Sequence, residues 1–167
     1  LHPFPTRRSS DLGNAYPSFE RGRKYLAPGL FGPCGYDLPA IVGAKIGCPD
    51  TPVVGFAGDG AFGIACTELT AIGRSEWPAI TMIVFRNYQW GAEKRNSTLW
   101  YDDNFVGTEL DTQVSYAKIA TACGLKGVQA RTQTELTTAL QETCKAQDKG
   151  ITTFIEVILN QELGEPF

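Results

Sequence analysis

Two side chains with metal-binding oxygens, Asp59 and Asn87, each come just after a short apolar run that has the length of a buried strand. They are 28 residues apart, which is about the length of one strand–helix–strand unit. Neighbouring parallel strands lie roughly 4.8 Å apart, so both side chains can reach one ion above the sheet edge. A carboxylate, an amide oxygen and diphosphate oxygens form a set that suits Mg²⁺. The spacing therefore predicts a divalent-cation site.

Glycines flank Asp59 on both sides in the sequence. Gly58, Gly60 and Gly63 match the G-x-G-x-x-G pattern of dinucleotide-binding loops between a strand and a helix. Two details oppose a dinucleotide. The Asp59 carboxylate would repel a pyrophosphate unless a cation lay between them, and the next strand ends in Arg86 rather than in an acid for a ribose. A bridging cation removes both objections, and a plain Asp-Gly turn remains the alternative.

The same loop is suited to phosphate in two further ways. Gly58 and Gly60 let a ligand approach the backbone closely, because neither has a side chain. We expect a helix to open near Ala61, and the free N–H groups at a helix start attract anions.

Alternating strand and helix patterns position these residues. Apolar or β-branched runs predict strands at 52–57, 79–85, 127–130 and 151–159, and helical spacing predicts helices at 35–46, 62–76 and 112–123, with a fourth from the capping box at 132–135 to Gly150. A long polar and aromatic connection, 87–111, is expected to be functional. The prediction is an α/β fold, a three-layer parallel sheet with helices on both faces.

Composition limits the possible partners. The chain has 167 residues, of which 43% are apolar, and its net charge is −3. Without clustered positive charge we expect no nucleic-acid partner, and no apolar run approaches the roughly 20 residues of a membrane helix. Five cysteines without metal-ligand spacing are expected to be reduced core residues of a cytoplasmic protein. The only histidine is His2, so catalysis by a Ser-His-Asp or Cys-His pair is not expected.

The first twelve residues differ from the rest. Residues 1–12 contain two prolines and two adjacent arginines, follow neither a helix nor a strand pattern, and resemble a translated sequencing adapter. We therefore expect 1–12 to be non-native and 13–167 to form the domain. We also expect this domain to be a fragment, truncated at both ends and without its first strand.

Three motifs give a family resemblance that covers about 13–167. Gly58-Asp59-Gly60, followed by 26 residues and Asn87, resembles the thiamine diphosphate motif, and 29–39 resembles a turn and helix of the acetolactate synthase superfamily. Residues 86–96 and 154–167 resemble members that transfer an acetyl group from a sulfonated aldehyde to phosphate. The resemblance implies a C-terminal thiamine diphosphate-binding domain of such an acyltransferase. An acetolactate synthase-like enzyme, another decarboxylase, a non-catalytic Rossmann-like nucleotide-binding module and a non-functional gene fragment remain alternatives.

The resemblance implies roles for individual residues. Asp59 and Asn87 would bind Mg²⁺ through their side chains and Gln89 through its carbonyl. The remaining cofactor contacts would come from glycines and small residues: Gly60, Ala61 and Gly91 at the diphosphate, Gly58 at the same loop, and Gly32 and Cys34 near the aminopyrimidine. Cys34 is smaller than the residue that relatives place there.

The resemblance also implies partners. They are an anionic substrate and phosphate. Because anions need fixed cationic donors, our own hypothesis is that Lys94 and Arg95, together with Arg86, attract them; a solvated basic turn is the alternative. Arg86 replaces an asparagine that is common in the family. No catalytic side chain is expected within the chain, because the activating Glu of relatives belongs to a separate N-terminal domain. The complete enzyme would be a homodimer or homotetramer, and the chain alone would bind the cofactor weakly and not turn over.

Overall fold

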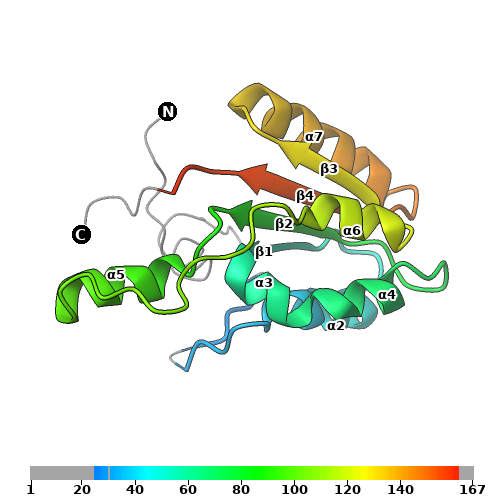
Figure 1. The fold of residues 1–167 in the computed structure, drawn as a ribbon. Helices are drawn as coiled ribbons and strands as arrows, with labels where there is room; N and C mark the ends of the chain where they lie inside the picture. Colours follow the sequence, from blue (N-terminus) through cyan, green and yellow to red (C-terminus); the bar gives the residue numbers. More distant parts are fainter. Residues whose placement is uncertain (1–24, 30, 162–167) are drawn as a thin grey trace.

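The computed structural model describes residues 25–29 and 31–161, and its centre is a sheet of four parallel strands. Figure 1 shows the strands β1 (Val54–Gly58), β2 (Thr81–Arg86), β3 (Lys126–Ala130) and β4 (Thr153–Ile158). Their spatial order is β1-β2-β4-β3. All four predicted strands are confirmed in place and in direction. The predicted non-native segment 1–12 lies outside the described residues.

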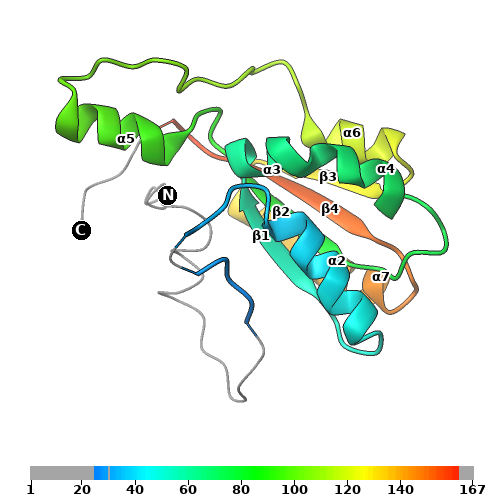
Figure 2. The ribbon, with the colours of Figure 1, turned by 90° about the horizontal axis from the view of Figure 1, so that it is seen from below.

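Helices cover both faces of this sheet, which confirms the three-layer α/β prediction (Figures 1 and 2). One face packs against α2 (Asp37–Gly47), α3 (Asp59–Ala65), α4 (Leu69–Ile72) and α6 (Tyr116–Ala122), and the other packs against α7 (Gln133–Gln147). Two apolar clusters fill the spaces between these layers. The first includes Leu38, Phe62, Leu69 and Phe154, and the second includes Ala139, Ile155 and Val157.

Two connecting segments differ from the sequence-based expectation. The predicted helix 62–76 begins earlier, at Asp59, and is divided by a short 3₁₀ turn, η1 (Cys66–Glu68). The connection 87–111 is not irregular throughout, because it contains the helix α5 (Gly91–Trp100), which extends away from the sheet in Figure 2. This helix was missed because it has no apolar stripe: its apolar residues Leu99 and Trp100 are exposed.

The cysteines also differ from expectation. All five are free, in agreement with reduced thiols, but none is a fully buried core residue. Cys34, Cys48 and Cys144 are exposed, and Cys66 and Cys123 are partly buried. Among the described residues, no helix combines the length and the apolar character needed to cross a membrane.

Glycine sets the distance between α6 and the sheet. A Cβ atom on Gly127 of β3 would lie 2.0 Å from the Ala117 carbonyl oxygen of α6, so only glycine permits this approach. A Cβ on Gly43, in the middle of α2, would have no neighbour within 4 Å. The two glycines therefore offer a matched pair for testing helix–sheet packing.

We predict opposite effects of the same substitution at these glycines. Gly127→Ala forces α6 away from β3 and lowers the free energy of unfolding by about 1–3 kcal/mol, as overpacking does. Gly43→Ala raises it by roughly 0.5–1 kcal/mol, because alanine favours a helix and has room. Urea denaturation of both variants measures these changes. A Gly127→Ala variant as stable as the parent would contradict the close packing.

Candidate metal and cofactor site

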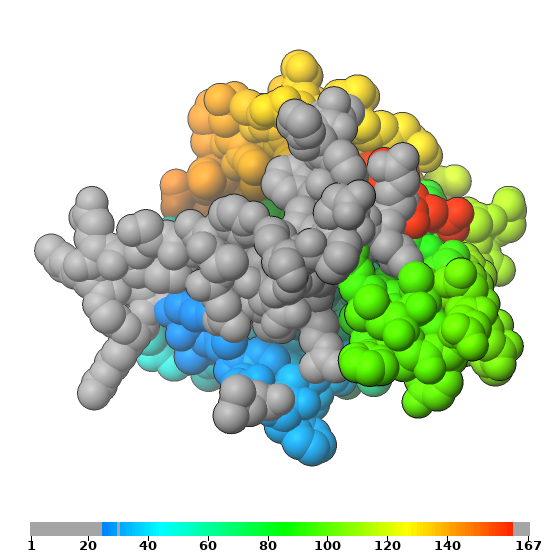
Figure 3. Space-filling model, turned by 90° about the vertical axis from the view of Figure 1, so that its left-hand side faces the viewer, coloured from blue at the N-terminus to red at the C-terminus, as the bar shows by residue number. Residues whose placement is uncertain are grey.

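The proposed cation ligands come together at the carboxyl edge of the sheet. Asp59 begins α3 directly after β1, and Asn87 directly follows β2. The register of these parallel strands pairs Gly58 with Phe85, so the segments that follow β1 and β2 leave the sheet side by side. Figure 3 looks onto this edge, where α5 and the end of β4 lie next to each other. The expected closeness of Asp59 and Asn87 is what the structure shows.

Hydrogen bonds fix the buried carboxylate of Asp59, which is 2% exposed. Oδ2 accepts from the Tyr88 N–H at 2.7 Å, and Oδ1 accepts from the Gly60 N–H at 3.1 Å. Asp59 is therefore tied to the loop that follows β2 as well as to its own helix. Its conformation does not depend on solvent.

Two further oxygen atoms, from the Asn87 amide and the Gln89 carbonyl, lie at this carboxylate, which supplies the third. The amide oxygen of Asn87 faces only other acceptors: Asp59 Oδ1 at 3.2 Å and the Gln89 carbonyl oxygen at 3.0 Å. In a chain without a cation, a half-turn of this amide would let its NH₂ group donate to both. With a cation between the three groups, the orientation that aims the Asn87 oxygen at the cation is the favourable one, because each oxygen is then a ligand.

The spacing of these oxygens fits magnesium. Oxygens at adjacent corners of an octahedron with metal–oxygen distances of about 2.1 Å are about 3 Å apart. The two measured separations are 3.2 and 3.0 Å. Three protein oxygens leave further positions for water and for phosphate oxygens, which is how Mg²⁺ is usually bound. Within the described residues no group of three His, Cys, Asp or Glu side chains offers an alternative metal centre.

An unusual backbone turn aims the Gln89 carbonyl at the other ligands. Tyr88, between Asn87 and Gln89, has φ of 61°, a left-handed conformation that is uncommon for a residue with a side chain. The returning chain holds the turn: the Trp90 N–H donates to the Thr108 carbonyl at 2.7 Å, and the Leu110 N–H donates to the Tyr88 carbonyl at 2.9 Å. Residues 87–89, called the metal loop from here on, are thus joined to the returning chain by an isolated antiparallel bridge between Gln89 and Glu109.

The glycines expected at the cofactor surround this edge. A Cβ on Gly58 would meet no atom within 4 Å, so space is open at the end of β1. Gly60 was expected to allow close approach of a ligand. In the structure it makes room for the Trp90 indole instead, because a Cβ on Gly60 would lie 2.8 Å from that ring. Ala61, on the first turn of α3, is partly buried.

The remaining expected cofactor contacts lie on two neighbouring segments. The turn with Gly32, whose φ is 56°, and the exposed Cys34 leads to Gly35, where a Cβ would lie 3.1 Å from Ile64 of α3. Gly91, the first residue of α5, is buried, and its N–H donates to the Gln89 carbonyl at 2.9 Å. A carbonyl oxygen has two lone pairs, so Gln89 can still bind a cation.

The expectation that Arg86 attracts a substrate anion is wrong. Its side chain is 1% exposed, and its Nη2 donates to the carbonyls of Asp111 and Val114 at 2.7 Å each. Its Nε lies 3.2 Å from Glu156 Oε1. Protein groups bind the guanidinium through hydrogen bonds of Nη2 and the ion pair with Glu156, although Nε makes no hydrogen bond, so Arg86 is part of the framework of the site.

The two other expected anion-binding residues lie on α5. The ammonium group of Lys94 forms an ion pair with Glu109, donates to Gln89 Oε1 at 3.1 Å and lies 5.2 Å from the centre of the Phe105 ring. Arg95 is partly buried and also has a partner. Lys94 is therefore held by protein groups next to the metal loop.

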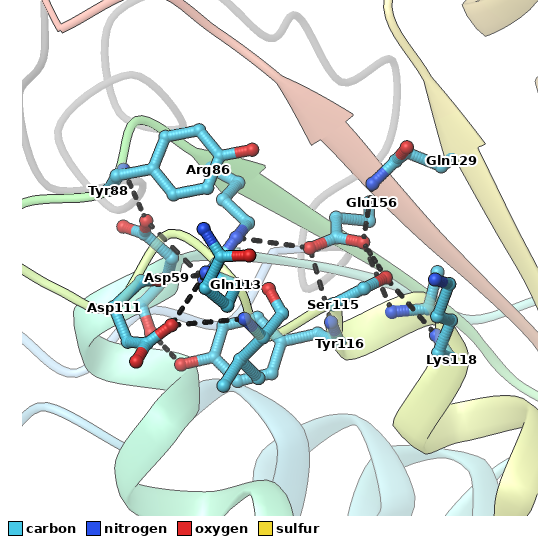
Figure 4. Close-up of polar contacts among 12 residues, drawn as sticks. Asp59, Arg86, Tyr88, Asp111, Gln113, Ser115, Tyr116, Lys118, Gln129 and Glu156 are labelled. Carbon is cyan, nitrogen blue, oxygen red and sulfur yellow. Dashed lines mark hydrogen bonds and ion pairs between the residues drawn. The ribbon is translucent and has the colours of Figure 1, made fainter.

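Sequence reasoning missed three residues that support the site. Glu156 is fully buried in the middle of β4, and the aromatic rings of Tyr88 and Tyr116 lie against Arg86 (Figure 4). A signal for Glu156 was present, because it is the only charged residue in an otherwise apolar run. Its partner could not be identified without the sheet order.

Burial changes the acidity of Asp59. Desolvation raises the pKa of this carboxyl from 3.8 to about 6, against the opposing effects of the Tyr88 N–H and of the Arg86 charge. The ionised form is thus costly in the folded chain. A divalent cation next to Oδ1 would offset this cost.

Comparison with known proteins connects this geometry with a family. The family model described as "Thiamine pyrophosphate enzyme, C-terminal TPP binding domain" matches residues 9–157. A sulfoacetaldehyde acetyltransferase from Roseovarius nubinhibens is 80% identical over 156 residues, which are 93% of this chain and 26% of that protein. The chain therefore spans about a quarter of the length of the curated relatives that it matches most strongly.

More distant relatives share the fold. The mitochondrial acetolactate synthase catalytic subunit of Saccharomyces cerevisiae is 30% identical over 118 residues, 71% of this chain and 17% of that protein. The solved thiamine diphosphate-dependent 4-hydroxybenzoylformate decarboxylase of Rhodococcus jostii is 28% identical with a TM-score of 0.71, covering 80% of this chain and 24% of its own. The predicted thiamine diphosphate-binding fold is thus confirmed.

The raised pKa predicts how stability depends on pH. Below pH 4, Asp59 is protonated in the folded and the unfolded chain; above pH 6 it is ionised in both, and the ion is buried in the folded one. In buffer with a chelator, the stability contributed by protonated Asp59 is therefore lost between about pH 4 and 6, on the order of 1–3 kcal/mol.

Urea denaturation of the parent and of Asp59→Asn at pH 5 and pH 7.5 measures this loss. The variant should gain stability relative to the parent as the pH rises. Asp37, whose pKa burial also raises to about 6, is present in both proteins and cancels in the difference. A difference independent of pH would contradict the assignment. Added Mg²⁺ should stabilise only the parent, and mainly at the higher pH.

Proposed function

Because the chain belongs to the thiamine pyrophosphate enzymes, as their C-terminal TPP-binding domain, we propose that it binds this cofactor through Mg²⁺. The ligands are Asp59, Asn87 and the Gln89 carbonyl. The convergence of their three oxygens, with separations of 3.2 and 3.0 Å, is the observation that supports this proposal most directly. A cation there joins an anionic protein site to an anionic diphosphate.

The chain's own residues bind and orient the cofactor. Gly58 leaves space for the diphosphate at the end of β1, and Gly60 and Ala61 lie next to this space on the first turn of α3. The Gly60 N–H already donates to Asp59, so the backbone N–H of Ala61 is the candidate donor to the diphosphate. Gly91 lies on the other side of the metal loop, and the turn with Gly32 and Cys34 is the candidate contact for the pyrimidine ring. When bound, the cofactor supplies the carbon nucleophile that attacks a carbonyl group.

We further propose that the chain is part of a sulfoacetaldehyde acetyltransferase. Such an enzyme converts sulfoacetaldehyde and phosphate into acetyl phosphate and sulfite. The 80% identity to the Roseovarius nubinhibens protein supports this proposal over an acetolactate synthase, for which the identity is 30%. The rest of the enzyme, including an activating Glu and a second subunit, comes from outside this chain. A cytoplasmic location belongs to the same proposal.

Lys94 and Arg95 remain our candidates for attracting the sulfonate or the phosphate. Lys94 lies 3.1 Å from the side chain of Gln89, whose carbonyl is a proposed metal ligand. Its charge is shared with Glu109, so an anion would have to compete with that carboxylate.

The cofactor proposal predicts selective binding. The chain should bind thiamine pyrophosphate with Mg²⁺, but not without Mg²⁺, and should not bind NAD⁺. Asp59→Ala should lose this binding, because it removes the ligand that carries the charge. Isothermal titration calorimetry measures all of these interactions. Asp50→Asn, in an exposed turn, is the matched control and should bind as the parent does. Tight binding of NAD⁺ would favour the nucleotide-binding alternative.

A chimera tests the proposed reaction. The 156 matching residues of this chain should replace their counterparts in the Roseovarius nubinhibens enzyme with retention of activity. We expect acetyl phosphate and sulfite from sulfoacetaldehyde and phosphate, measured by chromatography, and no acetolactate from pyruvate. The isolated chain should show no turnover.

Two variants of the chimera examine anion binding. Lys94→Gln and Arg95→Gln should raise the KM for phosphate or for sulfoacetaldehyde, because each removes a positive charge. Unchanged KM values would refute the anion-binding role. Formation of acetolactate by the chimera would refute the proposed reaction. Turnover by the isolated chain would refute the need for the rest of the enzyme.

A further inference from the structure

Arg86 is the residue before the proposed metal ligand Asn87, and the molecule surrounds it completely. Its guanidinium lies between two aromatic rings, 4.5 Å from the centre of Tyr88 and 4.6 Å from the centre of Tyr116. Figure 4 shows it lying between the Asp59 and Glu156 carboxylates. A fully buried arginine with this many partners is unusual, because its charge is costly to remove from water.

Glu156 compensates that charge. It is 0% exposed, and its Oε1 lies 3.2 Å from Arg86 Nε. The same carboxylate accepts from the backbone N–H groups of Tyr116 and Ala117 at 3.2 Å each, and from the Ser115 hydroxyl at 2.7 Å. Arg86 and Glu156 thus form a neutral pair. The negative charge of Asp59, 3.9 Å from Arg86 Nη1, remains available for a cation.

Tyr88 connects the Arg86–Glu156 pair with the metal loop. It lies between the ligands Asn87 and Gln89 and has the left-handed φ of 61°. Such a conformation persists only where its surroundings determine it. Its N–H is held by Asp59 Oδ2 at 2.7 Å, and its ring is held by the Arg86 guanidinium.

We propose that Arg86 is a positioning residue for the cation. Stacked on Tyr88 and anchored by Glu156, the planar guanidinium keeps Tyr88 left-handed and so keeps the Gln89 carbonyl aimed at Asn87 and Asp59. This inference rests on the proposed magnesium site and goes beyond it. It replaces the role in substrate binding that the sequence led us to expect.

The shape of Arg86, rather than its charge, is what the cation site requires. A positive charge near a metal ion repels the ion, so charge alone would weaken binding. The planar group, in contrast, stacks on an aromatic ring and donates in fixed directions, which a lysine ammonium cannot reproduce. Keeping the charge but changing the shape, as in Arg86→Lys, therefore weakens binding only if the shape matters. Removing the charge, as in Arg86→Met, weakens binding if the shape matters and strengthens it if only the charge does.

The test compares dissociation constants for Mg²⁺ at saturating thiamine pyrophosphate, measured by calorimetry well below the melting temperature. Arg86→Lys and Arg86→Met should each weaken Mg²⁺ binding by about 10-fold or more, the range seen for residues that orient metal ligands. Leu69→Ala, a core truncation in α4, is the control for general destabilisation and should leave the affinity unchanged.

A second pair of variants tests the ring without disturbing the buried charges. Tyr88→Phe keeps the ring and should retain the affinity within about 2-fold, whereas Tyr88→Gly permits the left-handed turn but loses the ring and should weaken binding by about 10-fold. These two variants also decide the question if the Arg86 variants do not fold.

Several results would overturn the inference. Arg86→Lys binding as the parent does, or Arg86→Met binding more tightly, would show that charge alone matters. Equal affinities of Tyr88→Gly and Tyr88→Phe would show that the ring does not hold the turn. A parent chain that does not bind Mg²⁺ with thiamine pyrophosphate would instead refute the proposed function, and this inference with it.

Discussion

Mutual repulsion among three oxygen atoms is the constraint on which the site depends. The Asn87 amide oxygen lies 3.2 Å from Asp59 Oδ1 and 3.0 Å from the Gln89 carbonyl oxygen, which is unfavourable unless a positive charge or a donated hydrogen lies between them. The chain maintains this approach by three means: parallel pairing of β1 with β2, hydrogen bonds to Asp59, and the turn at Tyr88. The hydrogen bond from Tyr88 to Asp59 and the left-handed turn at Tyr88 would be unnecessary in an ordinary Asp-Gly turn.

The site is also connected to elements that carry no ligand. Glu156 of β4 accepts hydrogen bonds from the start of α6 and forms an ion pair with Arg86 of β2. Buried ion pairs add little to stability once desolvation is counted, but removing one partner is costly. Gly127 brings α6 close enough to the sheet for this contact. The position of α6 and the shape of the metal loop are therefore linked through one buried pair.

The sequence predicted the parts of this molecule that repeat a simple pattern. Strands β1, β2 and β4 follow mostly apolar or β-branched runs, and the spacing of Asp59 and Asn87 follows from parallel pairing, so both were predictable. The signal for β3 was weaker, because Lys126 and Gln129 interrupt it. Helix α5 was not, because a polar helix has no periodic signal. The role of Arg86 was predicted wrongly. The sequence places Arg86 next to a metal ligand, and an arginine there is expected to be exposed to solvent. Its burial can be explained only once its partner Glu156, 70 residues away in sequence, is known.

Arg86 and Glu156 have to be considered as one unit. Arg86 without Glu156 would place an uncompensated positive charge near the cation and weaken its binding. Glu156 without Arg86 would be a buried carboxylate beside the ionised Asp59, supported only by hydrogen bonds. Neither residue is favourable alone at this edge of the sheet. The buried Arg86 thus requires a second acid deeper in the core, and the fold supplies it from β4, the strand next to β2, where Glu156 stands two positions before the register partner of Arg86.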